Sequence, residues 1–322
     1  MSDSSQRSRA VVSGGAGFIG SHTVEALVAD GWRVLVIDDL SHGCGAPLPD
    51  GADLLVADAG TAQAATAIRR FKPEAALHLA ARGGVAVALR DPQSYVAQSV
   101  ASSVGFFASA CDAGVHVLVT ASTGGALYGE ADVLPTPETS TPAPRSPYGA
   151  SKQAEEVYLD CFRRMHGIRA TALRYGNVYG PRQDGTGEAG VVAITAQRLV
   201  NGLAPRIYGD GRQTRDFVYV ANVAAANVAA LSAPPPRAVN VASGREAAVL
   251  EVVQTLADAS GSTLDVEFLP GRSGEVRRSC LDVEYAARAL DWRSTTTLRD
   301  GLHATYAWFA NNRLPEQVSG RR

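Results

Sequence analysis

The sequence predicts an α/β fold in which a doubly wound parallel sheet is joined to a smaller C-terminal lobe. Two observations predict it. Short apolar runs alternate with longer segments of helical periodicity through the first half of the chain, as they do where crossover helices join parallel strands. A glycine-rich turn, Gly14 to Gly20, follows the first apolar run and opens the first helical segment. Parallel strands are buried on both faces, which accounts for runs that are apolar throughout.

The elements follow in chain order. Six buried strands, each followed by a segment suited to a crossover helix, are expected at Arg9–Ser13, Arg33–Asp38, Asp53–Ala57, Ala75–Ala80, His116–Ala121 and Arg169–Leu173. From about Tyr175 the alternation gives way to loops rich in Gly, Pro and Arg, at Asn177–Gly190, Gly202–Arg215 and Pro270–Cys280. A late strand is expected at Val239–Ala242 and a closing helix at Leu298–Asn311.

This change of pattern predicts two domains. Residues 8–175, together with about 216–243, are expected to form a dinucleotide-binding domain of the Rossmann type. Residues 176–215 and 244–322 are expected to form the second lobe, with a ligand cleft between the two. A chain of 322 residues is long enough for one large core or two modest ones.

Bulk properties exclude several classes of protein. The net charge is −2 with scattered Lys and Arg, so no nucleic-acid surface is expected. No stretch approaches the roughly 18 apolar residues of a membrane span, and the first eight residues lack a signal peptide. No metal site is expected, because ligand spacing is absent around Cys44, Cys111, Cys161 and Cys280. We expect a reduced, cytoplasmic enzyme.

The glycine turn predicts a cofactor site. Gly14, Gly17 and Gly20 permit a tight turn, close approach of a pyrophosphate and close packing of helix on strand. Asp38 ends the second strand 18 residues beyond Gly20, where a carboxylate binds a ribose 2′-hydroxyl and repels a 2′-phosphate. NAD is therefore favoured over NADP. Asp58, after the third strand, reaches the adenine or is an exposed loop acid, and the sequence leaves both open.

A second pattern, Tyr148-Gly-Ala-Ser-Lys152, predicts proton transfer. Residues four apart on a helix face the same way. The Lys152 ammonium is expected to lower the pKa of the Tyr148 phenol, which is about 10 in water, so that it exchanges protons near neutrality. Beside a nicotinamide, such a pair deprotonates an alcohol while its carbon gives up hydride.

These motifs resemble those of the extended short-chain dehydrogenase/reductases, within the NAD-dependent nucleotide-sugar epimerase/dehydratase group. The resemblance covers nearly the whole chain. The motifs that carry it are the glycine turn, His78-Leu-Ala-Ala81, Tyr148-x-x-x-Lys152, Arg174-Tyr-Gly-Asn177-Val-Tyr-Gly-Pro181, Gly209-Asp-Gly-Arg-Gln-Thr-Arg215 and Pro270-Gly-Arg272-Ser-Gly-Glu275.

The resemblance implies further cofactor residues. Tyr175 would approach the nicotinamide end, and Ser99 stands where the group often has Asn. The remaining members of the expected NAD site are Phe18 and Ile19 of the glycine turn and the backbone of Leu79, Ala80 and Ala81.

The resemblance also implies a hydroxyl that binds the reacting sugar oxygen. Counting back four residues from Tyr128 reaches Gly124, so a one-residue bulge is needed to bring Thr123 to that place. Ser122 is the reserve choice. The alternative for both is a strand-end hydroxyl that satisfies only backbone groups.

Substrate contacts are implied in the same way. Asn177 and Arg215 match positions that contact a nucleotide diphosphate, and Arg272 and Glu275 match positions that hold phosphate and ribose. Surface ion pairs are the alternative for the two arginines.

The resemblance implies other positions for binding the nucleotide base and the sugar. Backbone at Arg206 and Tyr208 would pair with the base, expected to be uracil. Ser279 stands where enzymes restricted to glucose carry a bulky Tyr, so UDP-N-acetylglucosamine is expected to be accepted.

Three outcomes follow the shared oxidation at C4. A 4,6-dehydratase is disfavoured because Gly125 and Ala126 stand where that reaction needs an acid–base pair. The chain as a whole resembles the UDP-N-acetylglucosamine 5,6-dehydratases of tunicamycin biosynthesis, and this outcome is favoured, with Tyr128 and Glu130 as the nearest C5 base and C6 acid. The alternative for these two residues is a packed Tyr and a solvated Glu.

A 4-epimerase is the second expectation, and an NAD-binding regulator without turnover is a distant third. The resemblance also implies a homodimer through a bundle that contains the Tyr148 helix.

Overall fold

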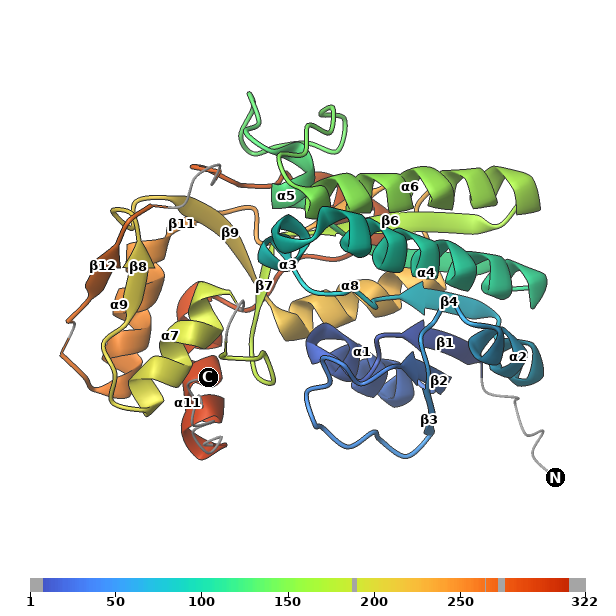
Figure 1. Cartoon of the computed structure of the whole chain (residues 1–322), viewed down its shortest axis with the longest axis horizontal. Coiled ribbons are helices and arrows are strands. Elements are labelled where there is room, and N and C mark those ends of the chain that lie inside the picture. Colours follow the sequence, from blue (N-terminus) through green and yellow to red (C-terminus); the bar gives the residue numbers. More distant parts are fainter. Residues whose placement is uncertain (1–7, 187–189, 264, 272–275, 313–322) are drawn as a thin grey trace.

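A seven-stranded parallel sheet forms the centre of the larger part of the structure, a computed structural model that describes residues 8–186, 190–263, 265–271 and 276–312 (Figure 1). The strand order is β10-β6-β5-β4-β1-β2-β3. The strands are β1 (Arg9–Ser13), β2 (Arg33–Asp38), β3 (Ala52–Val56), β4 (Ala75–His78), β5 (Val117–Thr123), β6 (Arg169–Tyr175) and β10 (Val239–Val241). This sheet confirms the predicted fold class.

Helices cover both faces of the sheet. On one face α2 (Ala62–Phe71), α4 (Pro92–Asp112) and α6 (Pro147–His166) bury their apolar sides against the strands. On the other, α1 (Phe18–Ala29), α8 (Val220–Ser232) and α10 (Glu284–Leu290) do the same. Two short helices, α3 (Val85–Arg90) and α5 (Gly124–Tyr128), follow β4 and β5. Figure 1 shows α4 and α6 on the opposite side of the sheet from α1 and α8.

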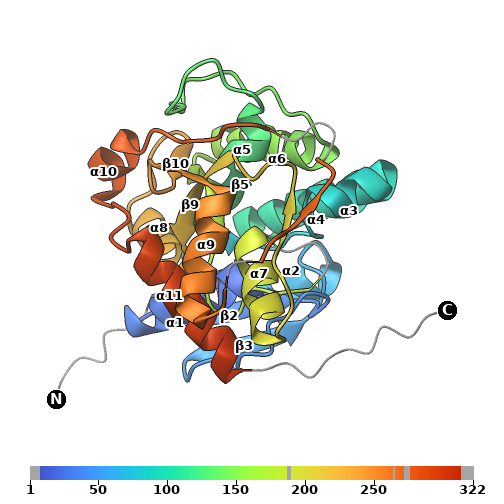
Figure 2. The same cartoon turned by 90° about the vertical axis from the view of Figure 1, so that its left-hand side faces the viewer.

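A smaller lobe lies beside this sheet, and it faces the viewer in Figure 2. Its helices are α7 (Val191–Val200), α9 (Val249–Ser260) and α11 (Leu298–Asn311), which share one apolar core. Two small sheets complete it: β11 (Glu246–Ala248), β9 (Thr214–Tyr219) and β7 (Asn177–Tyr179), and β12 (Glu267–Leu269) with β8 (Arg206–Tyr208).

Strand ends and short strands depart from the sequence prediction. β5 and β6 run on to the pair Thr123 and Tyr175, because the two strands stay in register to that point. The ranges expected as loops contain β7, β8 and the start of β9. Strands of three residues are too short to show a period of two, so the sequence pattern missed them.

The proposed domain division remains a proposal, and one segment packs across it. Residues 244–322 were assigned to the second lobe, yet Ala286, Leu290 and Trp292 lie in the core on the α1–α8 face of the central sheet. Among the described helices, none has both the length and the apolar character required to cross a membrane.

Asp216 on β9 ties three segments together where the lobes meet. It is fully buried, and its carboxylate accepts hydrogen bonds from the backbone N–H groups of Ser243, Gly244 and Leu281 and from the Ser243 hydroxyl. Burial raises the pKa of this carboxyl, whereas the four donors hold it down.

We predict that Asp216→Asn lowers the free energy of unfolding by about 3 kcal/mol. The NH2 group of the asparagine would face backbone N–H donors in a buried place, where neither finds an acceptor. Urea unfolding measures this. Asp53→Asn is the control, since Asp53 forms an exposed ion pair with Arg33 and should change stability by less than about 0.5 kcal/mol. Equal losses in the two variants would contradict the role given to Asp216.

Candidate functional site

The first turn of α6 positions Tyr148. Ser146 caps the helix by accepting the Gly149 N–H at 3.1 Å, and Pro147 occupies the first helical position. Gly149 lets this turn pack closely, because a Cβ there would overlap the carbonyl of Ala126 on α5. The Gly after Tyr148 therefore serves the contact between α5 and α6.

Thr123 ends β5 beside Tyr148, with which it shares a side-chain hydrogen bond. The expected bulge is wrong: β5 pairs with β6 without interruption from Val117 to Thr123. Thr123 also caps the N-terminus of α5, where its hydroxyl accepts the Ala126 N–H at 3.4 Å. The Thr123 hydroxyl is therefore beside Tyr148 without a bulge, and its contact with the sugar oxygen stays a prediction.

Lys152 lies one turn along α6 and is 4 % exposed. Its Nζ is 2.9 Å from Oε2 of Glu155, which is 1 % exposed. The other oxygen of Glu155 accepts the Ser99 hydroxyl of α4 at 3.2 Å. Ser99 therefore binds α6 directly. Sequence reasoning missed Glu155, although a carboxylate three residues after a helical Lys is a recognisable pair.

The charges do not act on Tyr148 as the sequence predicted. Lys152 does lower the pKa of the phenol, as does the hydrogen bond with Thr123, but burial and the Glu155 charge raise it by more. The pKa of Tyr148 therefore lies above its usual value. Lys152 stays charged, because Glu155 and Tyr148 outweigh the effect of its burial.

The two glycines of α5 give close access to a segment far along the chain. A Cβ on Gly124 would overlap the side chain of Leu281, and one on Gly125 would lie 3.2 Å from Ser279 Oγ. Ser279 is buried. Segment 279–281 thus packs directly on α5, and at Gly125 it lies at one of the two positions where a 4,6-dehydratase would carry its acid–base pair.

A buried polar network holds the other end of α5. The Tyr128 hydroxyl donates to Asn240 Oδ1 at 3.0 Å and accepts from Arg174 Nη1 at 2.8 Å. Arg174 is paired with Glu156, which also accepts the Ser122 hydroxyl at 2.5 Å. Tyr128 is 3 % exposed, and burial raises its pKa.

This network bears on two expectations. Tyr128 is buried, and its hydroxyl makes both of its hydrogen bonds within the network, as the alternative of a packed Tyr expects. Ser122 is committed to Glu156, which leaves Thr123 as the hydroxyl beside Tyr148. Glu130 is exposed and accepts the backbone N–H of Arg277 at 2.8 Å, so it connects the loop after α5 to the approach to Ser279.

The glycine turn fits a dinucleotide. Gly14 has φ +72°, and a Cβ there would lie 2.5 Å from the Ala80 nitrogen, so the turn packs on the loop after β4. Gly20 likewise packs against the carbonyl of Gly14. Around Gly17, by contrast, a Cβ would meet nothing nearer than 3.4 Å. The protein's own packing does not require that glycine, whereas close approach of a pyrophosphate does.

The rest of the turn agrees with this fit. The N-terminus of α1, which begins at Phe18 and Ile19, has no side-chain cap and no acidic residue in its first turn, so its N–H groups suit an anion. Leu79 and Ala81 flank Ala80 in the loop after β4, and the Leu79 N–H binds the Ser13 carbonyl at 2.9 Å. These residues could hold NAD.

Carboxylates gather at the ends of β2 and β3. Asp38 accepts the N–H groups of Ala16 and Leu40, both at 2.9 Å, which leaves room on its oxygens for ribose hydroxyls. Asp58 is bound by Arg82 at 2.5 Å and by Ser102. Asp39, the other partner of Arg82, was missed by sequence reasoning.

Tyr175 lies in the core. Its backbone pairs beside Thr123, but its hydroxyl donates to Asn227 Oδ1 at 2.6 Å and its ring is buried. Only its backbone is therefore placed near Tyr148.

The substrate residues come from the smaller lobe. Asn177 is exposed on β7, and Arg215 lies on the neighbouring strand β9, where it donates to the Thr214 carbonyl. Arg206 is paired with Glu267, and its strand β8 has a neighbour along only one edge among the described strands. The Tyr208 carbonyl accepts the side-chain amide of Gln213 at 2.8 Å, and pairing of this backbone with a base stays a prediction. Arg272 and Glu275 lie outside the described residues.

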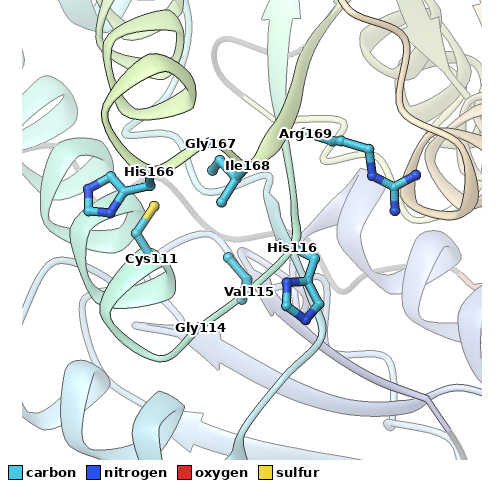
Figure 3. Close-up of a pocket in the computed structure, with 8 residues that line it drawn as sticks. All are labelled: Cys111, Gly114, Val115, His116, His166, Gly167, Ile168 and Arg169. Atoms are coloured by element: carbon cyan, nitrogen blue, oxygen red, sulfur yellow. The ribbon is translucent and has the colours of Figure 1, made fainter.

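A separate hollow of about 360 Å³ lies elsewhere, below the ends of α4 and α6 where β5 and β6 begin (Figure 3). None of the expected site residues lines it. Burial raises the pKa of the Cys111 thiol in its wall to about 11, so that thiol stays protonated. Its walls are formed by Cys111, Gly114, Val115, His116, His166, Gly167, Ile168 and Arg169.

Comparison with known proteins assigns the chain to a family. Residues 10–242 match the NAD dependent epimerase/dehydratase family, so the chain belongs to that family of NAD-dependent enzymes. A UDP-glucose 4-epimerase of Mycolicibacterium smegmatis is 39% identical over 94% of this chain and 99% of its own.

Two solved structures are similar throughout. A UDP-glucose 4-epimerase of Thermotoga maritima, solved with UDP-glucose, has a TM-score of 0.91 and 39% identity, covering 94% of this chain and 99% of its own. An NAD-dependent NDP-hexosamine 5,6-dehydratase involved in tunicamycin biosynthesis has a TM-score of 0.87 and 30% identity, covering 95% and 98%.

We predict that Tyr128→Phe lowers the free energy of unfolding by about 2 kcal/mol, because Arg174 Nη1 and Asn240 Oδ1 each lose a hydrogen-bond partner in a buried place. Nucleotide-sugar turnover should stay within the same order of magnitude, whereas loss of a catalytic base costs at least about 100-fold. Urea unfolding and initial rates measure the two effects. Tyr158→Phe, on the exposed side of α6, is the control for stability. A hundredfold loss of rate in a folded Tyr128→Phe would restore Tyr128 as a base.

Proposed function

We propose that this enzyme is a UDP-sugar 4-epimerase, which oxidises C4 of the hexose and reduces the ketone from its other face. The observation that carries the proposal is the packing of segment 279–281 on Gly124 and Gly125 of α5. At Gly125 it fills one of the two positions where a 4,6-dehydratase carries its acid–base pair. The C5 base expected for a 5,6-dehydratase, Tyr128, is committed to Arg174 and Asn240. The 39% identity to UDP-glucose 4-epimerases supports the same conclusion.

Each residue of the site has a part in this reaction. Tyr148 accepts the proton of the C4 hydroxyl and later returns it. Thr123, hydrogen-bonded to Tyr148, holds the same sugar oxygen. Lys152 supplies a positive charge that favours the phenolate. NAD held by the glycine turn and Asp38 would supply the hydride acceptor and donor at C4. Between these steps the sugar ring turns, so that the second transfer reaches the opposite face.

A 5,6-dehydratase is the second candidate function. It is favoured by the 30% identity to the NDP-hexosamine 5,6-dehydratase. Its C4 oxidation would use Tyr148 and Lys152 in the same way. It needs a C5 base and a C6 acid in addition, and of the two residues expected for these roles Tyr128 is buried in the polar network and Glu130 holds the Arg277 backbone.

We further propose that UDP-N-acetylglucosamine is accepted beside UDP-glucose. Ser279 is small, buried and adjacent to Gly125, next to the catalytic end of β5. A small side chain there leaves volume for an acetamido group. The uracil, diphosphate and ribose contacts expected at Arg206, Tyr208, Asn177, Arg215, Arg272 and Glu275 belong to the same proposal.

A second copy of the chain is the proposed partner. Helices α4 and α6 pack together and expose Val96, Val157, Tyr158 and Met165. Apolar side chains gathered on two adjacent helices suit a bundle formed with the same helices of a second chain. A cytoplasmic location stays a prediction of the sequence.

We predict that incubation with UDP-glucose or UDP-N-acetylglucosamine gives a product of unchanged mass that is the C4 epimer, as measured by mass spectrometry and proton NMR. Tyr148→Phe should lower the rate by about 100-fold or more, because general acid–base catalysis is worth that much. Loss of one water together with the proton NMR signals of a 5,6-alkene would instead establish the 5,6-dehydratase. Unchanged activity in Tyr148→Phe would overturn the catalytic assignment.

We predict that Ser279→Tyr lowers kcat/KM for UDP-N-acetylglucosamine about tenfold or more relative to UDP-glucose, since the phenol fills the acetamido volume. Initial rates with both sugars measure the ratio, and Ser279→Ala, which stays small, serves as the control. An unchanged ratio in a folded Ser279→Tyr would remove Ser279 from the sugar pocket.

A further inference from the structure

A buried carboxylate stands beside the catalytic pair, and no step of the proposed reaction uses it. Glu155 lies on α6, three residues after Lys152 and seven after Tyr148, so all three side chains project from one side of the helix. Glu155 is 1 % exposed and Lys152 is 4 % exposed. Buried charges are found where a partner compensates them, and here each is the partner of the other at 2.9 Å.

The carboxylate is held from a second helix. Ser99 of α4 donates its hydroxyl to Glu155 Oε1 at 3.2 Å, while Lys152 binds Oε2. Ser103, one turn further along α4, donates to the Ser99 carbonyl. Both oxygens of Glu155 are therefore occupied, and its position is fixed by α4 and by α6 together.

The remaining groups around Tyr148 contribute little charge. His78 on β4 is buried between Ser13 and Ser103, and burial lowers its pKa to about 3, so it is neutral. Tyr95 on α4 meets the Tyr148 ring at 6.5 Å, and burial raises its pKa to about 12. On α3, which also packs on α6, Arg90 is exposed. Lys152 and Glu155 are thus the two charges that act at close range.

We propose that Glu155 is a positioning residue that fixes the Lys152 ammonium beside Tyr148 and cancels part of its charge, thereby setting the pH at which Tyr148 gives up its proton. This inference rests on the proposed role of Tyr148 as proton acceptor. A lysine alone would lower the pKa of Tyr148 and favour the phenolate. A Lys152–Glu155 pair has no net charge, so it favours the phenolate much less and the phenol stays protonated to higher pH.

The directions of the pKa shifts agree with this geometry. Glu155 raises the pKa of Lys152, which keeps the ammonium charged in spite of its burial. Glu155 also raises the pKa of Tyr148, against the effect of Lys152. While Lys152 stays protonated, removing the carboxylate charge should therefore lower the pKa of Tyr148, and the ascending limb of the pH–rate profile should move to lower pH.

The test is Glu155→Gln, which keeps the shape and removes the charge. Phenolate at position 148 is measured by ultraviolet absorbance as the difference between each protein and the same protein carrying Tyr148→Phe. At a fixed pH below the midpoint, Glu155→Gln should show about tenfold more phenolate than the wild type, equivalent to about one pH unit. The ascending limb of the pH–rate profile should shift by the same amount, and Glu155→Asp should restore it.

Glu156→Gln is the matched control. It removes the neighbouring carboxylate of the same helix, which is paired with Arg174, so it should lower stability without moving the Tyr148 titration. Circular dichroism verifies that each variant is folded. An unchanged phenolate fraction in folded Glu155→Gln, or an equal shift in Glu156→Gln, would overturn the proposal.

Ser99→Ala covers the case in which Glu155→Gln does not fold. Without the Ser99 hydroxyl, the Glu155 carboxylate interacts more strongly with Lys152 and cancels more of its charge. The phenolate fraction of Tyr148 should therefore fall about twofold, opposite to the rise expected in Glu155→Gln. No change in Ser99→Ala would then count against the proposal. The titration needs no substrate, so it remains decisive even if the sugar reaction is not the one proposed.

Discussion

The buried ammonium of Lys152 is the constraint on which the rest of the site depends. A charge that is 4 % exposed must be compensated, and Glu155 compensates it from within the same helix. Ser99 reaches across from α4 to hold that carboxylate, which ties the two helices together at the site. Tyr148, which is hydrogen-bonded to Thr123, lies close enough for the Lys152 charge to lower its pKa. The packing of α4 on α6 therefore also fixes the position of the Lys152 charge beside Tyr148.

Close packing also explains why α5 begins with two glycines. Its glycines give up side chains, so that Leu281 and Ser279 approach the backbone from a segment more than 150 residues away. Arg174, Tyr128, Asn240 and Glu156 anchor the far end of the helix. Thr123 caps the N-terminus of this anchored helix, whereas a 4,6-dehydratase would need carboxylates at Gly125 and Ala126. The glycines of α5 accommodate Leu281 and Ser279 and provide no acid–base pair, which agrees with the epimerase reaction that we propose.

Sequence alone predicted the parts of this molecule that rest on local chemistry. The central strands, the glycine turn and the Tyr148–Lys152 pair each have a period or spacing that physics imposes. Contacts between distant segments left no such signal: the network of Tyr128 and the packing on Gly125 became visible only in three dimensions. Lys152 lowers the pKa of Tyr148 as predicted, but the net shift of that pKa is upward, because Glu155 and burial were not considered. Glu155 itself could have been found from its spacing to Lys152.

The central claim is that one Tyr148–Lys152 site removes hydride from C4 and returns it to the same carbon. It is tested most directly with UDP-glucose that carries deuterium at C4. We predict that the product formed by the enzyme as purified keeps the deuterium at C4, by NMR and mass spectrometry, with none released to solvent. Loss of the label, or its appearance at another carbon, would contradict the account.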